Sequence, residues 1–406
     1  MTPRAPLADF DDALARLLAA AVPVDGVEQV DTMAAHGRVL AHPVRSSLRV
    51  PPADNTSMDG YAVRAADLSG AMRLRVAQRI PAGSVGMPLE PGTAARVFTG
   101  AQLPPGADAV VMQEQAEPDG EHVVLRHRPQ PGEWVRRAGE DIEPGAVILP
   151  AGSPVTPQAA GLAASVGHAS LAVRRRVRVA CFFTGSELAM PGEPLAPGAI
   201  YNSNRFVLVG MLARLGCEVL DLGIVPDTLA ATRAALRKAA AGSDLIVTSG
   251  GVSVGDEDHV KPAVDAEGAL DLWQIAIKPG KPLAFGHVRR DGARPAHFLG
   301  LPGNPVSSFV TFALFVRPFV LLLSGRTDSA PTAYGLRADF DWPRPDRRRE
   351  FLRVRRNGSG GLDLFDRQGS GVLTSTVWAD GLVDNPAGAA IRAGDTVRYL
   401  PFSDLV

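Results

Sequence analysis

The feature that most constrains the fold is a regular alternation of short apolar runs and amphipathic segments beginning at Arg176. Such alternation builds a parallel sheet whose faces are covered by helices. Asp227 suits a helix start, and Gly216 and Gly242 suit helix ends. We expect strands at 177–183, 218–224, 244–248 and 297–301, with helices at 203–215, 228–241 and 305–323. The sequence therefore predicts an α/β domain over residues 173–326.

The rest of the chain predicts further domains. With 406 residues it is too long for one core, since domains average ~150 residues. Short β-like runs between Pro and Gly turns indicate a small inserted β domain at 51–137 and a C-terminal β domain at 327–406. An amphipathic helix at 8–21 opens an N-terminal helical and linker domain, expected to combine 1–50 with 138–172.

Composition excludes several classes of protein. Forty-two basic residues nearly cancel 43 acidic ones, which argues against binding to nucleic acid or to a membrane surface. The longest apolar stretch, 306–323, is interrupted by Arg317 and Pro318 and predicts a buried helix. Cys181 and Cys217 lie in apolar runs and are expected to be reduced core residues. With no export signal visible, these features favour the cytoplasm.

A glycine-rich segment, 248–258, follows the strand expected at 244–248. Its Gly250, Gly251 and Gly255 let the backbone approach a phosphate or oxyanion closely. Asp256 and Asp258 are hard oxygen donors suited to Mg²⁺ beside a pyrophosphate. Because loops at the carboxyl ends of parallel strands bind ligands, this segment is a candidate site. A plain glycine turn with solvated carboxylates remains the alternative.

Other loops of the same sheet carry charged or capping residues. Lys278 and Lys281 flank a Pro-Gly turn and suit a doubly charged anion, with solvated surface lysines as the alternative. Asn304 begins a helix whose free N–H groups suit an anion, although a capped core helix has the same pattern. Glu187 and Asp227 follow two further strands, so polar residues converge on one edge.

The polar segment 54–63 opens the inserted β domain, and chemistry alone gives no role for its Asp59. Together with the loops above, it is similar to the molybdopterin molybdenumtransferase family, which includes the C-terminal part of gephyrin. The similarity covers nearly the whole chain in order and separation. It rests on residues 55–63, 98–101, 106–112, 248–255, 278–282 and 301–307.

The resemblance implies an elongated, four-domain homodimer that converts adenylylated molybdopterin and molybdate to molybdenum cofactor and AMP, with Mg²⁺. It implies the adenylyltransferase of the preceding step as a partner, and molybdoenzymes or cofactor chaperones downstream. Active-site roles carry over to Asp59, Thr99, Glu187, Asp227, Asp258, Lys278 and Lys281. Asp59 and Thr99 would come from the partner subunit's inserted domain. Mg²⁺ would bind Asp256 and Asp258, and the cofactor would contact Gly250, Gly251, Ser253, Gly255, Pro302, Asn304 and Ser307.

The sequence departs from the family pattern at Gln274, where relatives often carry a basic residue. The family's C-terminal arginine corresponds to Arg348, Arg349 or Arg353, and its serine to Ser370 or Ser375.

Two other functions stay open. One is the adenylyltransferase, whose glycine loop usually continues Gly-Gly-Thr-Gly. The other is a gephyrin-like scaffold without catalysis, which would not need the polar cluster. Molybdenum and tungsten are not distinguished.

Overall fold

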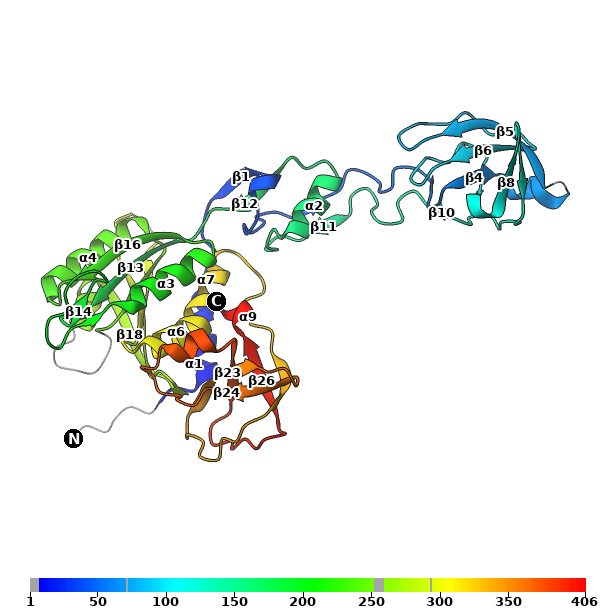
Figure 1. Cartoon of the computed structure of the whole chain (residues 1–406). Helices are drawn as coiled ribbons and strands as arrows, with labels where there is room; N and C mark the ends of the chain where they lie inside the picture. Colours follow the sequence, from blue (N-terminus) through cyan, green and yellow to red (C-terminus); the bar gives the residue numbers. More distant parts are fainter. Residues whose placement is uncertain (1–6, 71, 252–258, 293) are drawn as a thin grey trace.

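The computed structural model describes residues 7–70, 72–251, 259–292 and 294–406. The molecule is elongated, with a larger body at one end, a separate β domain at the other and a narrow arm between them (Figure 1). The body combines an α/β domain with a C-terminal β domain. This arrangement confirms the multidomain α/β plus β fold predicted from the sequence.

The α/β domain is built on a six-stranded sheet with the order β16-β13-β17-β21-β20-β18. All residues of the central strand β17 are buried, because helices cover both faces of the sheet. The four parallel strands coincide with the predicted ones to within one or two residues. They are β13 (Arg178–Thr184), β16 (Glu218–Val225), β17 (Leu245–Ser249) and β21 (Ala296–Leu301).

Two strands at one edge make the sheet mixed, which corrects the prediction of a parallel sheet. β20 (Pro282–Val288) runs antiparallel to β21 and to the edge strand β18 (Gly268–Gln274). Gly286 interrupts the apolar pattern of β20, and Asp271 interrupts that of β18, which obscured both strands in the sequence. A Cβ at Gly268 would lie 1.8 Å from the carbonyl oxygen of His287, so the close backbone approach requires glycine there.

Helices pack on the two faces of this sheet. α3 (Ser203–Arg214) packs in the core that also holds the helix following β21. α4 (Leu229–Gly242) and α5 (Val260–Glu267) pack on the opposite face. The side chains of Asn202 and Thr228 accept hydrogen bonds from backbone N–H groups in the first turns of α3 and α4.

A continuous helical stretch, Pro305–Leu323, runs through the core of the body. It consists of α6 (Pro305–Thr311), a π-helical turn (Phe312–Val316) and α7 (Arg317–Leu323). By length and composition it could cross a membrane, yet 89% of its most apolar window is buried within the protein. The predicted buried helix is therefore confirmed.

The first helix, α1 (Phe10–Ala19), packs against this stretch. Asp9 caps it by accepting a hydrogen bond of 2.8 Å from the Asp11 amide. The Phe10 ring lies 5.3 Å from that of Phe315 and 5.5 Å from that of Phe351. The helix thus belongs to the core of the body, whereas the expected division grouped residues 1–50 with 138–172.

The arm is formed by two antiparallel strand pairs and one helix, and the chain runs along it twice (Figure 1). Its elements are β1 (Val27–Asp31), β2 (Val44–Arg45), β11 (Val147–Leu149), α2 (Pro157–Ser165) and β12 (Ser170–Arg174). The distal β domain holds a six-stranded sheet ordered β7-β4-β6-β5-β9-β8. Its strands are β4 (Gly60–Val63), β5 (Arg73–Ile80), β6 (Thr93–Val97), β7 (Ala109–Met112), β8 (Ala116–Asp119) and β9 (His122–Leu125).

The C-terminal domain is a small closed barrel, because β23 pairs with β25 as well as with β24. A short body strand, β19 (Ile277–Lys278), pairs with β23 and joins the barrel to the loop that carries the predicted lysines. The barrel strands are β22 (Tyr334–Ala338), β23 (Arg349–Arg356), β24 (Gly361–Leu364), β25 (Gly381–Asn385) and β26 (Thr396–Pro401).

Candidate active site

A cavity of about 840 Å³ opens where the parallel strands of the body end. Loops after β13, β16, β17 and β21 contribute to its wall, as does the barrel. This is the edge at which open α/β sheets bind ligands. Nine of the predicted site residues line it: Glu187, Asp227, Gly250, Gly251, Lys278, Lys281, Pro302, Asn304 and Ser307.

The glycines after β17 have backbone conformations that other residues rarely adopt. Gly250 has φ +96° and Gly251 has φ +64°. A Cβ at Gly250 would lie 2.5 Å from the Thr184 carbonyl oxygen, so the β17 and β13 loops touch through backbone alone. The predicted Ser253, Gly255, Asp256 and Asp258 lie outside the described residues.

Hydrogen bonds from one asparagine tie two of the loops together. The Asn204 amide nitrogen donates to Ser249 Oγ and to the Gly303 carbonyl, both at 2.8 Å. Ser249 Oγ in turn donates to the Pro302 carbonyl at 2.9 Å. The β17 loop and the start of α6 are therefore held in a fixed relation. Sequence reasoning missed Asn204, whose only signal was its place just after the cap of α3.

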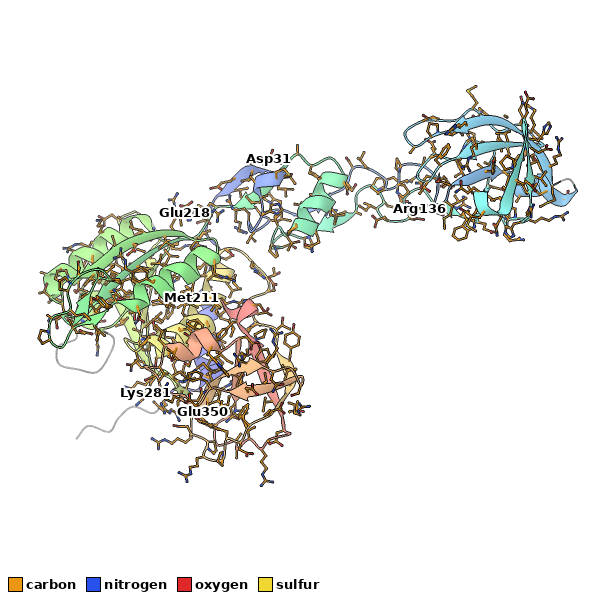
Figure 2. The ribbon with its side chains drawn as sticks, viewed as in Figure 1. Asp31, Arg136, Met211, Glu218, Lys281 and Glu350 are labelled. Atoms are coloured by element: carbon orange, nitrogen blue, oxygen red, sulfur yellow. The ribbon has the colours of Figure 1, made fainter. Side chains whose placement is uncertain are left out.

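The lysine turn faces the barrel. Lys278 Nζ lies 3.1 Å from Glu350 Oε1 and 3.5 Å from Asp346 Oδ2. Arg348 forms a paired contact with the same Asp346, at 3.0 and 2.9 Å. Figure 2 labels Glu350 in the barrel and Lys281 in the body. The positive charge of Lys278 is therefore partly neutralised by the carboxylates of Asp346 and Glu350.

Glu350 is completely buried and was missed in the sequence. Besides Lys278, it accepts hydrogen bonds from Trp342 Nε1 at 2.7 Å and from the Asp346 amide at 3.1 Å. The Arg348 side chain, which donates to Asp346, lowers the pKa of that carboxyl. The Arg348 and Lys278 contacts favour the ionised form of Asp346, so this carboxylate stays charged beside the lysine turn.

The barrel also distinguishes between the alternatives left open by the sequence. Arg348 and Ser370 line the cavity. Arg349 instead makes a paired contact with Asp384, at 2.6 and 2.7 Å. Arg353 is 1% exposed and donates to the buried Ser375. Only the first arginine and the first serine are thus placed to meet a ligand in this cavity.

Two acidic residues of the body complete the wall. The Glu187 carboxylate packs on Gly185, where a Cβ would lie 2.6 Å from Oε2. Asp227 follows β16 and precedes α4. Gln274, noted as a departure from the family, does not line the cavity. Its Oε1 atom is buried, with no hydrogen-bond partner among the described residues.

Asp59 and Thr99 lie in the distal domain, at the far end of the arm from the cavity (Figure 1). The Thr99 amide and hydroxyl both donate to Asp59 Oδ1 at 2.7 Å. The amide contact is the largest reason why the pKa of Asp59 is lowered. Within one chain, the structure therefore brings these two together but not to the other predicted residues.

Three family models match successive parts of the chain. Residues 8–167 match the MoeA N-terminal region (domain I and II), residues 180–321 a probable molybdopterin binding domain, and residues 336–402 the MoeA C-terminal region (domain IV). A molybdopterin molybdenumtransferase of Haemophilus influenzae is 38% identical over 388 residues, covering 93% of this chain and 95% of the relative. The chain belongs to the molybdopterin molybdenumtransferase family.

Further members of the family agree. A molybdopterin molybdenumtransferase of Bacillus subtilis is 35% identical, over 89% of this chain and 87% of the relative. The crystal structure of a molybdopterin biosynthesis MoeA protein from Pyrococcus horikoshii OT3 has a TM-score of 0.85 and 28% identity, covering 98% of this chain and 100% of that one. The protein is therefore a transferase of molybdenum cofactor biosynthesis, as the sequence predicted.

No group of three or more His, Cys, Asp and Glu suited to a metal occurs among the described residues, which exclude the predicted ligands Asp256 and Asp258. The described cavity still offers the carboxylates of Glu187 and Asp227, whose oxygens suit Mg²⁺. The donor chemistry of the cavity therefore fits a magnesium ion.

Both cysteines are free thiols, and burial raises the pKa of Cys217 to about 12.

Proposed function

We propose that this cavity inserts molybdate into adenylylated molybdopterin and releases AMP. The observation that carries the proposal is the convergence of a glycine turn, two lysines, an arginine and two carboxylates on one cavity of about 840 Å³. This volume is within the range of ~300–1,000 Å³ typical of pockets for sizeable ligands. Family membership supports the same reaction.

The residues divide by their chemistry. The backbone around Gly250 and Gly251 would cradle phosphate oxygens, because no side chain obstructs the approach. Lys278, Lys281 and Arg348 would hold molybdate or a phosphate as cationic donors. Glu187 and Asp227, with Asp256 and Asp258, would bind Mg²⁺, which supplies charge neutralisation at the anhydride when bound.

The central experiment follows AMP release from adenylylated molybdopterin with Mg²⁺ and either molybdate or tungstate. We expect oxyanion-dependent release that Asp227→Asn lowers by about 100-fold, a typical loss for an electrostatic group at the reacting centre. Asp265→Asn, an exposed aspartate on α5, is the matched control. Release that is absent with both oxyanions despite substrate binding would overturn the proposal. The two oxyanions also decide between molybdenum and tungsten.

Arg348 gives a second, sharper comparison. Arg348→Gln should weaken oxyanion binding, because this guanidinium lines the cavity. Arg353→Gln should instead destabilise the barrel, because its side chain is buried. Equal oxyanion affinity in Arg348→Gln and the native protein would contradict the assignment of Arg348.

We propose further that the protein is a homodimer, in which Asp59 and Thr99 complete the site of the other subunit. Their position at the end of the arm supports this, since their own cavity lies at the opposite end (Figure 1). Mixed dimers of Asp59→Asn and Asp227→Asn chains test it. If sites form across chains, one site per mixed dimer is native and activity returns, whereas each variant alone stays inactive. Continued inactivity of the mixture would overturn the shared site.

We place the reaction in the cytoplasm and propose the adenylyltransferase of the preceding step as a partner. The chemistry of the substrate supports the partnership, because direct transfer between the two proteins keeps an adenylylated dithiolene out of solution. Sedimentation of the two purified proteins together, with and without adenylylated molybdopterin, measures the interaction. Two independent sedimenting species under both conditions would contradict it.

A further inference from the structure

A second, smaller pocket lies where β12 of the arm meets α3 and α7 of the body (Figure 1). Its volume is about 190 Å³, below the ~300–1,000 Å³ of pockets that hold drug-sized ligands. The pocket can therefore hold a small ion but not an adenylylated pterin. It is separate from the cavity described above, since the two share no lining residue.

The wall of this pocket is unusually rich in guanidinium groups. They come from the arm, from the connection into β13 and from the ends of α3 and α7: Arg38, Arg174, Arg175, Arg176, Arg214 and Arg326. Guanidinium groups present planar, paired N–H donors that match the oxygens of tetrahedral oxyanions. Clustered cations in a partly buried place are unfavourable unless anions offset them.

Carboxylates offset only part of this charge. Arg38 pairs with Glu28, Arg175 with Asp244 and Arg326 with Asp328. Arg174 and Arg176 donate instead to backbone carbonyls, those of Val24 at 3.3 Å and Gly216 at 2.8 Å. Within the described part of the chain, neither of these two arginines is paired with a carboxylate.

One donor in this wall is left without a partner. The Nε atom of Arg174 is buried and makes no hydrogen bond to any described residue. The guanidinium is held in place by Gly325, where a Cβ would lie 2.3 Å from this Nε. A buried cationic group without a full set of acceptors is costly, and an anion bound beside this guanidinium would offset its charge.

We propose that this pocket binds a tetrahedral oxyanion dianion, such as sulfate, phosphate or molybdate, and thereby fixes the arm on the body. Its lining comes from both parts, so an ion bound there contacts arm and body at once. The competing explanation is that the arginines only stabilise the carboxyl ends of α3 and α7, whose partial charge is negative. That explanation predicts no response to oxyanions.

Hydrogen exchange followed by mass spectrometry tests this with a local readout. Peptides covering 170–178, 211–218 and 321–327 are compared in sodium sulfate and in sodium chloride at equal ionic strength. At about ten times its dissociation constant, sulfate should slow exchange in these peptides roughly tenfold if they exchange through opening of the bound state. The same series with phosphate and molybdate separates a general oxyanion site from one selective for molybdate.

Arg174→Gln/Arg176→Gln should abolish this protection. Arg128→Gln/Arg392→Gln removes the same charge at two exposed positions elsewhere and should leave it unchanged. Small-angle X-ray scattering then measures whether the bound ion restricts the range of positions that the arm takes relative to the body. The proposal is overturned if the Arg174 and Arg176 variant is protected equally, if none of the three ions protects these peptides, or if scattering is unaffected by a protecting ion. Exchange protection depends on neither substrate nor turnover, so failure here is distinct from failure of the proposed function.

Discussion

Replacement of Glu350 is the most informative perturbation of the barrel. The carboxylate is fully buried and accepts from Lys278 through Oε1 and from Trp342 and the Asp346 amide through Oε2. Glu350→Ala leaves the last two donors buried without an acceptor, at about 1–3 kcal/mol each. The Lys278 contribution is smaller, because that side chain is 37% exposed and can turn to solvent or to Asp346. We expect a total loss of about 3–5 kcal/mol.

Glu350→Gln should cost less. Its one carbonyl oxygen can keep the contacts to Trp342 and the Asp346 amide, while its amide nitrogen faces Lys278 and cannot accept. We therefore expect about 0.5–1.5 kcal/mol, the worth of one ordinary hydrogen bond, because the part-exposed Lys278 can turn to solvent. Glu121→Gln, an exposed glutamate of the distal domain, should stay within about 0.5 kcal/mol of the native protein.

Global unfolding of a multidomain protein is not one transition, so the assay must be local. Native-state hydrogen exchange of the β23 amides reports the opening free energy of the barrel itself. The expected order is native, then Glu350→Gln, then Glu350→Ala. If Glu350→Ala and the native protein open with free energies within about 0.5 kcal/mol, the buried donors are satisfied in another way and the reasoning is wrong.

Three further predictions concern other parts of the body. Burial lowers the pKa of His297 below its ordinary value of 6.5, so the unfolded chain binds this proton more readily. Stability should therefore fall as pH drops below 6.5. His297→Phe should lose part of that dependence, measured by native-state hydrogen exchange of the β21 amides at pH 7.5 and 5.5 after correction for the intrinsic exchange rates. An unchanged dependence would contradict this. Gly251→Ala should lower AMP release, because a Cβ there would lie 2.5 Å from a Val260 methyl; native activity would refute this. Cys181 and Cys217 should resist iodoacetamide at pH 8 until unfolded, because burial raises the pKa of both thiols. Rapid alkylation of the folded protein would contradict this.

The sequence predicted those parts of the site whose signals are local. Gly250 and Gly251 follow a strand that begins with the apolar run Leu245–Val247, and their positive φ values make glycine the favoured residue. The lysines flank a Pro-Gly turn, which is visible in any window of four residues. Asn204 was missed because its partners, Ser249 and Gly303, are 45 and 99 residues away in the chain. Such contacts exist only after the sheet has formed.

The choice among the barrel arginines shows a second limit. Arg348 lies just before β23, whereas Arg349 and Arg353 lie within it. Successive residues of a strand point to opposite sides, so an error of one residue reverses every assignment. The pairing of β23 with β25 fixes this register: Phe351 lies opposite Asp384, and Arg349, two residues earlier on the same side, reaches Asp384 diagonally. No local pattern in this arginine-rich segment carries that information.

The contact between body and barrel explains why the position of the lysine turn depends on the C-terminal domain. β19 pairs with β23, so Lys278 lies directly opposite Glu350 and within reach of Asp346. An oxyanion arriving at Lys278 must compete with these carboxylates, while Arg348 is already engaged by Asp346. The same contacts that stabilise the barrel thus reduce the positive potential offered to the ligand. It follows that Glu350→Gln should destabilise the barrel and yet bind oxyanion more tightly, a pairing of effects that loss of folding alone would not produce.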